Sequence, residues 1–279
     1  MKYFIDTEFL EGSQKEKFPI SLFKKDTPPT IDLISIGIVS EGGREYYAIS
    51  KEFNLEEAWN RYDEKPNPNY IPSIGGLCDG SYNPMFIKEY WIRENVLLPI
   101  WRDLFFKSDD CIGLSNRQTE YYYQEIMQGD YDKYFSFKSI KILIERFGKT
   151  NKEIANDLIK IISPLNEKHF GTYPYTYAEN VEFYAYYADY DWVAFCWLFG
   201  KMMDLPKGFP MYCKDLKQML DDKIDKINHE AQLISPGCPV VTCKSMKENN
   251  PLYPKQENEH NALADARWNK KLYEFLIHI

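Results

Sequence analysis

The chain has 279 residues, with 34 Lys and Arg against 42 Asp and Glu, so its formal charge is −8. At roughly 100–200 residues per domain, this length suits one large domain or two small ones. Hydrophobic residues make up 44% of the chain, which excludes disorder as the main state. The acidic balance argues against a non-specific coating of DNA, although metal ions can neutralise an acidic nucleic-acid site.

The amino terminus has only three consecutive apolar residues, 3–5, before the first acid, which is too short for a secretory signal peptide. The longest apolar run, 192–199, is far shorter than the ~18 residues that a membrane span needs. The six cysteines form no C-x-x-C pair, so we interpret them as reduced and structural. We therefore expect a cytoplasmic protein without a membrane span.

Three runs rich in β-branched and aromatic residues predict strands at 2–6, 31–40 and 44–50. Glu41-Gly42-Gly43 between the last two is typical of a hairpin turn. A fourth apolar strand is predicted at 181–188. The following run, 192–199, has the length of a buried helix and ends at Gly200, a residue that favours helix termination.

The remaining segments have helical or irregular patterns. Helices are predicted at 86–106, 151–162, 212–220 and 263–276. Pro and Gly residues indicate irregular stretches at 62–84 and 234–258. About 130 residues separate the third and fourth strands, which is more than a simple crossover requires, so part of this region is an insertion.

The first candidate for chemistry is Asp6-Thr7-Glu8 at the end of the opening strand. Residues two apart point to the same face if the strand continues, so Asp6 and Glu8 would share one site. Two close carboxylates repel each other unless a cation binds between them, and a hard divalent ion with oxygen ligands is the usual one. An isolated pair of this kind is most often a solvated strand end.

Asp191 follows the fourth strand, where the sites of α/β proteins gather. By itself, such a residue is more often an N-cap that accepts hydrogen bonds from the first turn of a helix. Asp189 is a rival position. We prefer Asp191 because the apolar run 192–199 starts directly behind it.

The third candidate is His260-Asn261-Ala262-Leu263-Ala264-Asp265. We expect Asp265 on the first turn of the last helix and His260 in the loop before it, so the two side chains can be oriented independently. A metal ligand needs a rigid element, whereas a general base must reach a water molecule. Each residue also has an ordinary interpretation, as an exposed loop histidine and as a first-turn acid at the positive end of the helix dipole.

The acidic pair, then Asp191, then His260 with Asp265 resemble, in this order, the histidine type of the DEDD exonuclease superfamily (DEDDh), whose fold is ribonuclease H-like. Further stretches are similar to a compact bacterial 3′-5′ exoribonuclease group sometimes labelled polyadenylate-specific, at 3–9, 33–37, 44–48, 91–99, 190–191 and 260–267. The resemblance implies an α/β fold with a mixed central sheet and flanking helices, as a single exonuclease domain over 1–279. Four segments outside it are expected to be insertions, at 11–29, 62–85, 107–148 and 224–258.

The resemblance also implies a hydrolase that uses two divalent cations, Mg²⁺ or Mn²⁺. Asp6 would bridge both ions, while Glu8 and Asp265 would help to hold the site that activates water. Asp191 would act through the water shell of the second ion. Four carboxylates carry about the charge that two divalent ions neutralise, and such an ion pair can stabilise both the attacking and the leaving oxygen.

By the same resemblance, His260 would be the general base, a role that suits a type of side chain that titrates near neutrality. Phe9 and Leu10 resemble positions that contact the terminal nucleotide of the substrate. Base stacking on aromatic rings tolerates any sequence, which would suit the removal of successive nucleotides.

The implied activity is hydrolysis of phosphodiester bonds from the 3′ end of RNA, with release of nucleoside 5′-monophosphates. Single-stranded DNA stays open as a substrate, because discrimination depends on contacts to the 2′-hydroxyl that no motif here identifies. A non-catalytic binding module on the same fold is disfavoured, because all four acids and the histidine are present. The resemblance also allows a homodimer.

Overall fold

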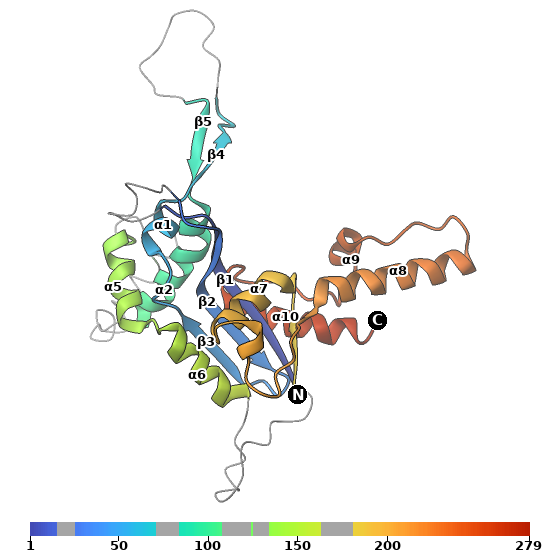
Figure 1. Ribbon diagram of the computed structural model, residues 1–279. Coiled ribbons are helices and arrows are strands. Elements are labelled where there is room, and N and C mark those ends of the chain that lie inside the picture. Colours follow the sequence, from blue (N-terminus) through green and yellow to red (C-terminus); the bar gives the residue numbers. More distant parts are fainter. Residues whose placement is uncertain (16–25, 71–83, 108–123, 125–133, 163–180) are drawn as a thin grey trace, which may run out of the picture. The chain divides into compact units, whose positions relative to one another are not determined.

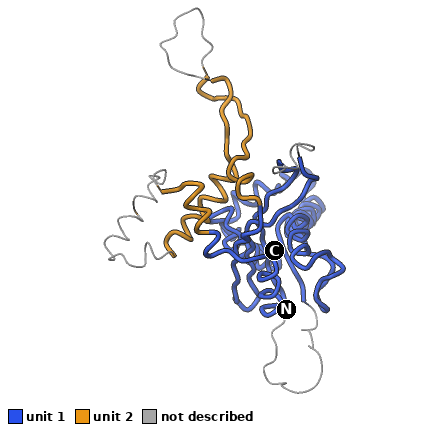
Figure 2. Tube along the Cα trace, turned by 60° about the vertical axis from the view of Figure 1, so that its left-hand side comes forward, with its two compact units in different colours: residues 1–53, 144–279 blue, residues 54–143 orange. Residues whose placement is uncertain are grey.

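A computed structural model of the chain describes residues 1–15, 26–70, 84–107, 124, 134–162 and 181–279 (Figure 1). The chain divides into two compact units, one made of Met1–Phe53 with Ile144–Ile279 and the other of Asn54–Leu143 (Figure 2). All the candidate site residues belong to the first unit. Parts of three expected insertions, at 16–25, 71–83, 108–123 and 125–133, lie outside the described residues, as does the segment 163–180.

Within the described residues, the first unit is built on a five-stranded mixed sheet in the order β3-β2-β1-β6-β7 (Figure 1). The antiparallel part consists of β1 (Lys2–Gly12), β2 (Thr30–Ser40) and β3 (Glu45–Ile49). The parallel part adds β6 (Glu182–Ala185) and β7 (Lys214–Asp215). The expected α/β class with a mixed central sheet is therefore confirmed.

Helices flank the sheet. The described helices of this unit are α6 (Asn151–Ile162), α7 (Ala188–Trp197), α8 (Leu216–Ile234), α9 (Cys243–Asn249) and α10 (Ala262–Leu276), and a short 3-10 turn, η3, covers Met202–Asp204.

Side chains of β1 point alternately to the two faces of the sheet. Tyr3 and Ile5 belong to a core cluster with residues of α6 and α7, whereas Phe4 belongs to another with residues of α8 and α10. Asp6 and Glu8 continue the second series, so β1 directs them toward α10.

The second unit contains α1 (Leu55–Asn60), β4 (Asp63–Pro66), β5 (Phe86–Glu89), the π-helix η2 (Arg93–Leu97), α2 (Leu98–Lys107) and most of α5 (Phe137–Phe147). Its packing is aromatic. The ring of Phe135 lies 4.9 Å from that of Trp59 and 5.5 Å from that of Trp101, measured between centroids. Arg93 lies over the ring of Trp59 and also donates to the carbonyl oxygen of Trp59 at 2.7 Å.

A close backbone approach fixes the start of α10 against the sheet. Gly37 of β2 pairs with Asp6 of β1. A Cβ atom at Gly37 would lie only 2.1 Å from the carbonyl oxygen of Ala262, the first residue of α10. Glycine is therefore required at this position, because any side chain would push the helix away from the acidic strand.

The boundary between β6 and α7 differs from the prediction. The strand expected at 181–188 ends at Ala185, and the helix expected at 192–199 already begins at Ala188. Both alanines are buried, so hydrophobicity does not change where the strand gives way to the helix. Asp191 consequently lies inside the first turn of α7 and is not its N-cap.

Capping side chains shift the bounds of two other helices. The helix expected at 212–220 is α8, which starts after Asp215 because the Asp215 carboxylate accepts hydrogen bonds from its first turn. The helix expected at 263–276 is α10, which is capped by the side chain of Asn261. The predictions for 151–162, 31–40 and 44–50 agree closely with α6, β2 and β3.

Two stretches expected to be irregular contain regular structure. α9 lies within 234–258 and begins with a capping box of Thr242 and Ser245. β4 lies within 62–84 and pairs with β5, so the segment 86–106 opens with a strand and becomes helical only afterwards. Strands of four residues are too short for their periodicity to distinguish them from the start of a helix.

None of the described helices is both long and apolar enough to cross a membrane. Free thiols are found at Cys196, Cys213, Cys238 and Cys243, while the other two cysteines lie outside the described residues.

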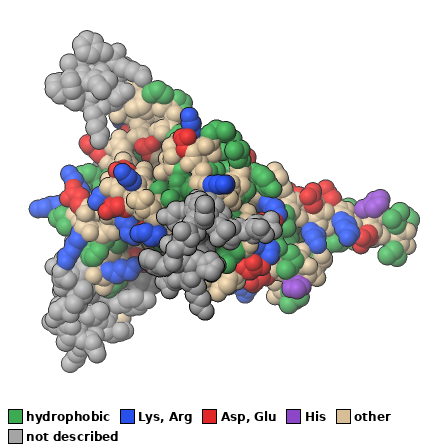
Figure 3. Space-filling model, turned by 60° about the horizontal axis from the view of Figure 1, so that its bottom comes forward, with side chains coloured by type: hydrophobic (Ala, Val, Ile, Leu, Met, Phe, Trp, Pro, Cys, Tyr) green, Lys and Arg blue, Asp and Glu red, His purple; other side chains and the backbone are tan. Residues whose placement is uncertain are grey.

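Hydrophobic side chains are exposed at the carboxyl-terminal end of α8, where Leu233 and Ile234 are largely accessible to solvent (Figure 3).

Candidate active site

The site is organised around the edge of β1. Parallel pairing of β6 with β1 covers only Lys2–Phe4. Beyond it, the carbonyl oxygen of Ile5 accepts a hydrogen bond from the Asn269 side chain at 2.8 Å. The Thr7 N–H donates to Asp191 Oδ1 at 2.8 Å, and the Thr7 hydroxyl donates to the same oxygen at 2.6 Å. α10 and α7 are therefore both attached to the backbone immediately beside the first acid.

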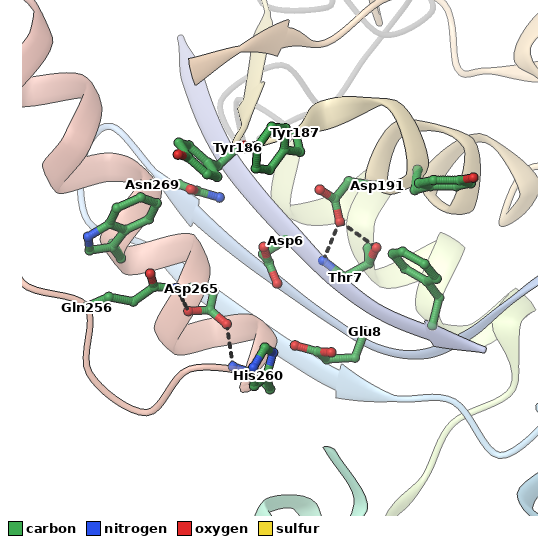
Figure 4. A pocket seen from close by; sticks show the side chains of 13 residues that line it. Asp6, Thr7, Glu8, Tyr186, Tyr187, Asp191, Gln256, His260, Asp265 and Asn269 are labelled. Atoms are coloured by element: carbon green, nitrogen blue, oxygen red, sulfur yellow. Dashed lines mark hydrogen bonds between the residues drawn. The ribbon is translucent and has the colours of Figure 1, made fainter. Parts of the chain in front are cut away.

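Three carboxylates meet between β1 and the first turn of α10. Oxygens of Asp6, Glu8 and Asp265 lie within 4.8 Å of one another (Figure 4). Glu8 is 9% exposed and Asp265 6% exposed, so water screens them poorly. The strand continues through Glu8, as the spacing of the acidic pair required, and the two strand acids reach the same helix.

Asp191 lines the same pocket but is not one of the three clustered acids. Its carboxylate is 5% exposed, and one of its oxygens receives both hydrogen bonds from Thr7. The rival Asp189 is exposed on α7 and does not line the pocket. Asp191 thus both positions β1 against α7 and adds a fourth carboxylate to the pocket.

His260 lies in the loop before α10 and lines the pocket together with Glu8 and Asp265 (Figure 4). Its backbone is left-handed, with φ +66°, which is uncommon for a residue with a side chain. This conformation lets its N–H donate to Asp265 Oδ2 at 2.8 Å, while Gln256 Nε2 donates to Oδ1 at 2.6 Å. The loop therefore holds both oxygens of the Asp265 carboxylate, one through the backbone N–H of His260 and the other through the side chain of Gln256.

The acids line a pocket of about 270 Å³ that has an aromatic wall. Phe9 lines this pocket, and its ring packs against that of Tyr190 at a centroid distance of 5.5 Å. Leu10 does not line it, because its side chain is completely buried. Of the two residues expected to contact a nucleotide, the structure brings only Phe9 to the site.

Burial raises the pKa values of all four carboxyl groups, and repulsion from nearby acids adds to it. Burial is the largest cause at Asp6, whose pKa rises well above its usual range, and the charges of the other three acids add to it. Burial followed by the charge of Asp265 raises the pKa of Glu8 to about 8. Burial raises the pKa of Asp191 to about 7 despite the opposing hydrogen bonds from Thr7, and it also raises that of Asp265.

These properties fit a divalent cation. Hard cations such as Mg²⁺ prefer carboxylate oxygens, and the clustered groups offer several oxygens within the span of one ion. A carboxyl group whose anion is disfavoured by burial and repulsion gains most when a positive charge arrives. The donor set of Asp6, Glu8 and Asp265 therefore matches the expected metal in both chemistry and electrostatics.

Comparison with known proteins supports a relation to exoribonucleases. No family model matches the chain. Over 274 residues it is 26% identical to a 3′-5′ exoribonuclease of Mycobacterium tuberculosis strain CDC 1551 / Oshkosh and, equally, to a 3′-5′ exoribonuclease of strain H37Rv. Each alignment covers 96% of this chain and 88% of the relative. Similarity at this level, extending over nearly the whole chain, supports a connection with 3′-5′ exoribonucleases at the level of the family.

Sequence reasoning missed the residues that hold the acids in place. Asn269 is 1% exposed and lies four residues after Asp265, so it shares the same face of α10. That spacing was a usable signal for a polar residue facing the sheet. Gln256 lies in a Pro-containing loop with no periodicity. Thr7 lies between two acids, and nothing in its position indicates that it bonds to Asp191. Neither residue therefore offered a comparable signal.

The raised pKa of Glu8 predicts how stability depends on pH in the metal-free protein. A carboxyl group with a raised folded-state pKa contributes stability that is fully present below its unfolded value and is lost as pH rises through the folded value. For Glu8 the loss spans the window from about 4.5 to about 8. We expect Tm in a chelator to decline less steeply across this window in Glu8→Gln than in the wild type.

The control for this measurement is Glu56→Gln, which changes an exposed glutamate on α1 of the second unit. It should keep the wild-type dependence of Tm on pH. If Glu8→Gln also keeps the wild-type dependence, the Glu8 carboxyl group is not destabilised by its surroundings.

Proposed function

We propose that this chain is a metal-dependent 3′-5′ exoribonuclease of the histidine-type DEDD superfamily with a ribonuclease H-like fold. The observation that carries the proposal is the cluster of Asp6, Glu8 and Asp265 in a pocket shared with Asp191 and His260. The similarity of nearly the whole chain to two 3′-5′ exoribonucleases supports RNA as the substrate. The product is a nucleoside 5′-monophosphate released from the 3′ end.

Asp6, Glu8 and Asp265 would hold the divalent cations, with Asp191 acting from the opposite side of the pocket through water. Two such ions would supply positive charge that offsets the phosphate and stabilises the oxygens of an in-line displacement. The carboxylates need rigid support for this role. β1 provides it together with α7 and α10, because buried hydrogen bonds of Thr7 and Asn269 attach each of these helices to the strand.

His260 would accept the proton of the attacking water. Its position before α10 supports this assignment, since its backbone is fixed to Asp265 while the residue lines the same pocket as the acids (Figure 4). Water attacks phosphorus as the bond to the 3′-oxygen of the preceding nucleotide breaks. The water proton goes to His260, and the leaving 3′-oxygen takes a proton from solvent. Phe9 would contact the terminal nucleotide.

A 5′-labelled single-stranded RNA should give a ladder that shortens one nucleotide at a time in Mg²⁺ or Mn²⁺ and stays intact in a chelator. Asp265→Asn should reduce hydrolysis to near background, because it removes an anion from the cation site while the side chain keeps nearly the same size and shape. Gel analysis of labelled RNA and DNA oligonucleotides measures both effects and the preference between the two substrates.

Asp225→Asn is the matched control, since this residue is exposed on α8 and does not line the pocket. It should retain the wild-type rate. Internal fragments at early times, or an unchanged rate on RNA with a blocked 3′ end, would exclude the exonuclease assignment. A folded Asp265→Asn protein with the wild-type rate would remove Asp265 from the site.

The role of His260 predicts slower chemistry with metal binding preserved. His260→Asn is the appropriate variant, because Asn tolerates the left-handed backbone and keeps the N–H that donates to Asp265. General bases contribute ~10²–10⁴-fold, so kcat should fall by about that factor. The metal concentration for half-maximal rate should change little. A variant that keeps kcat but needs much more metal would identify His260 as a ligand.

The homodimer and the cytoplasmic location suggested by the sequence stay predictions, as does the insertion character of the segments outside the resemblance.

A further inference from the structure

Tyr187 is a strained residue of the pocket that the proposed chemistry does not use. It precedes α7 with φ 57° and ψ 53°, the left-handed conformation that bulky side chains rarely adopt. Its side chain makes no capping hydrogen bond to the helix. The residue lines the pocket, yet 63% of its surface is exposed. Strain of this kind persists only where the surrounding structure enforces it, and it often marks a functional position.

Neighbouring contacts enforce the conformation. The N–H of Ala188, directly after Tyr187, donates to Asp215 Oδ2 at 2.9 Å, which fixes the start of α7. On the other side, the Tyr186 ring packs edge-on against Trp268 at 5.1 Å and against Tyr187 at 4.7 Å. The segment around Tyr187 is therefore held by Asp215 at the end of β7 and by Trp268 of α10, while Tyr187 itself lines the pocket.

Helix α10 shows where this ring lies relative to the general base. His260 lies just before the helix, Asp265 is on its first turn, and Trp268 lies about one turn beyond Asp265. Because Tyr186 packs on Trp268, the two tyrosines occupy the end of the pocket away from His260. Figure 4 shows the same order, with His260 and Tyr187 at opposite ends and Asp6 between them.

This order has a consequence for the substrate, which rests on the proposed function. In an in-line displacement the attacking and leaving oxygens lie on opposite sides of phosphorus. Water activated by His260 attacks from the His260 end, so the leaving 3′-oxygen lies toward the other end. In a 3′-5′ exonuclease that oxygen belongs to the penultimate nucleotide, which therefore extends toward Tyr187.

We propose that Tyr187 stacks on the base of the penultimate nucleotide and positions the leaving group. The preferred substrate is then a single-stranded 3′ end of at least two nucleotides, whose penultimate base is unpaired and free to stack. Stacking on an aromatic ring accepts any base. This contact therefore favours single-stranded ends of sufficient length and does not discriminate between base sequences. Tyr187 is a positioning residue, because it touches the substrate away from the reacting atoms.

Three 5′-labelled RNA oligonucleotides of one sequence test the proposal: one complete, one abasic at the penultimate position and one abasic at the terminal position. Tyr187→Asn removes the ring and suits the left-handed backbone, whereas Tyr187→Phe keeps the ring. Tyr212→Asn is the matched control, because Tyr212 is equally exposed at 63% and does not line the pocket. Initial rates over a range of RNA concentrations give KM and kcat for each pair.

Base stacking on a side chain corresponds to about a 5- to 150-fold change in affinity. On complete RNA, Tyr187→Asn should raise KM within this range and leave kcat within a few-fold, since the contact exists before and during the reaction. The wild type should show the same KM increase on the RNA that is abasic at the penultimate position, and Tyr187→Asn should add nothing further there. Tyr187→Phe and Tyr212→Asn should retain the wild-type KM.

The proposal is overturned if Tyr187→Asn leaves KM unchanged on complete RNA, or if its effect disappears on the terminal abasic RNA and persists on the penultimate one. The second outcome would assign Tyr187 to the terminal base. Failure of the proposed function gives a different result, because the wild type would then hydrolyse none of the three RNAs.

Discussion

The site depends on the early separation of two neighbouring strands. β6 pairs with β1 for only three residues, so the strand edge that carries the first acid loses its backbone partner just before the acid. A buried, unpaired carbonyl or N–H is costly, and side chains of other elements supply the missing partners. Asn269 of α10 bonds to Ile5, and Asp191 of α7 bonds to Thr7, on either side of Asp6. The hydrogen bonds that satisfy the edge of β1 therefore also bring α7, which carries Asp191, and α10, which carries Asp265, to Asp6.

This architecture places negative charge where the protein alone cannot stabilise it. Asp265 is the best supported of the four acids, because both of its oxygens accept hydrogen bonds from the loop before α10. At Asp6 and Glu8, burial and the charges of neighbouring acids all act to raise the pKa values. A rigid cluster of disfavoured anions is a preorganised cation site, since binding relieves repulsion without any rearrangement of the protein. Apolar side chains buried in the two cores of this unit stabilise the fold and offset the electrostatic repulsion within the site.

The sequence predicted what depends on local pattern. The opening strand as far as Asp6 and the helix that carries Asp265 follow from hydrophobic pattern and spacing, whereas the mixed central sheet was expected from the family resemblance. What it could not provide is set by tertiary contacts. The start of α7 was misplaced because the apolar run 181–188 crosses the boundary unchanged, and Asn269 matters only because β6 leaves β1 early. The left-handed backbone of Tyr187 likewise depends on its neighbours and leaves no trace in the sequence.

Calorimetric titration of the metal-free protein with Mn²⁺ tests the central claim most directly, namely that Asp6, Glu8 and Asp265 form one cation site. At pH 7 Glu8, with its pKa raised to about 8, is largely protonated, so binding must displace protons. Titrations in two buffers with different ionisation enthalpies measure that release. We expect saturable binding with proton release in the wild type, less release in Glu8→Gln, and much weaker binding in Asp265→Asn. Binding that is absent in the wild type, or that is unchanged in both variants, would contradict the account.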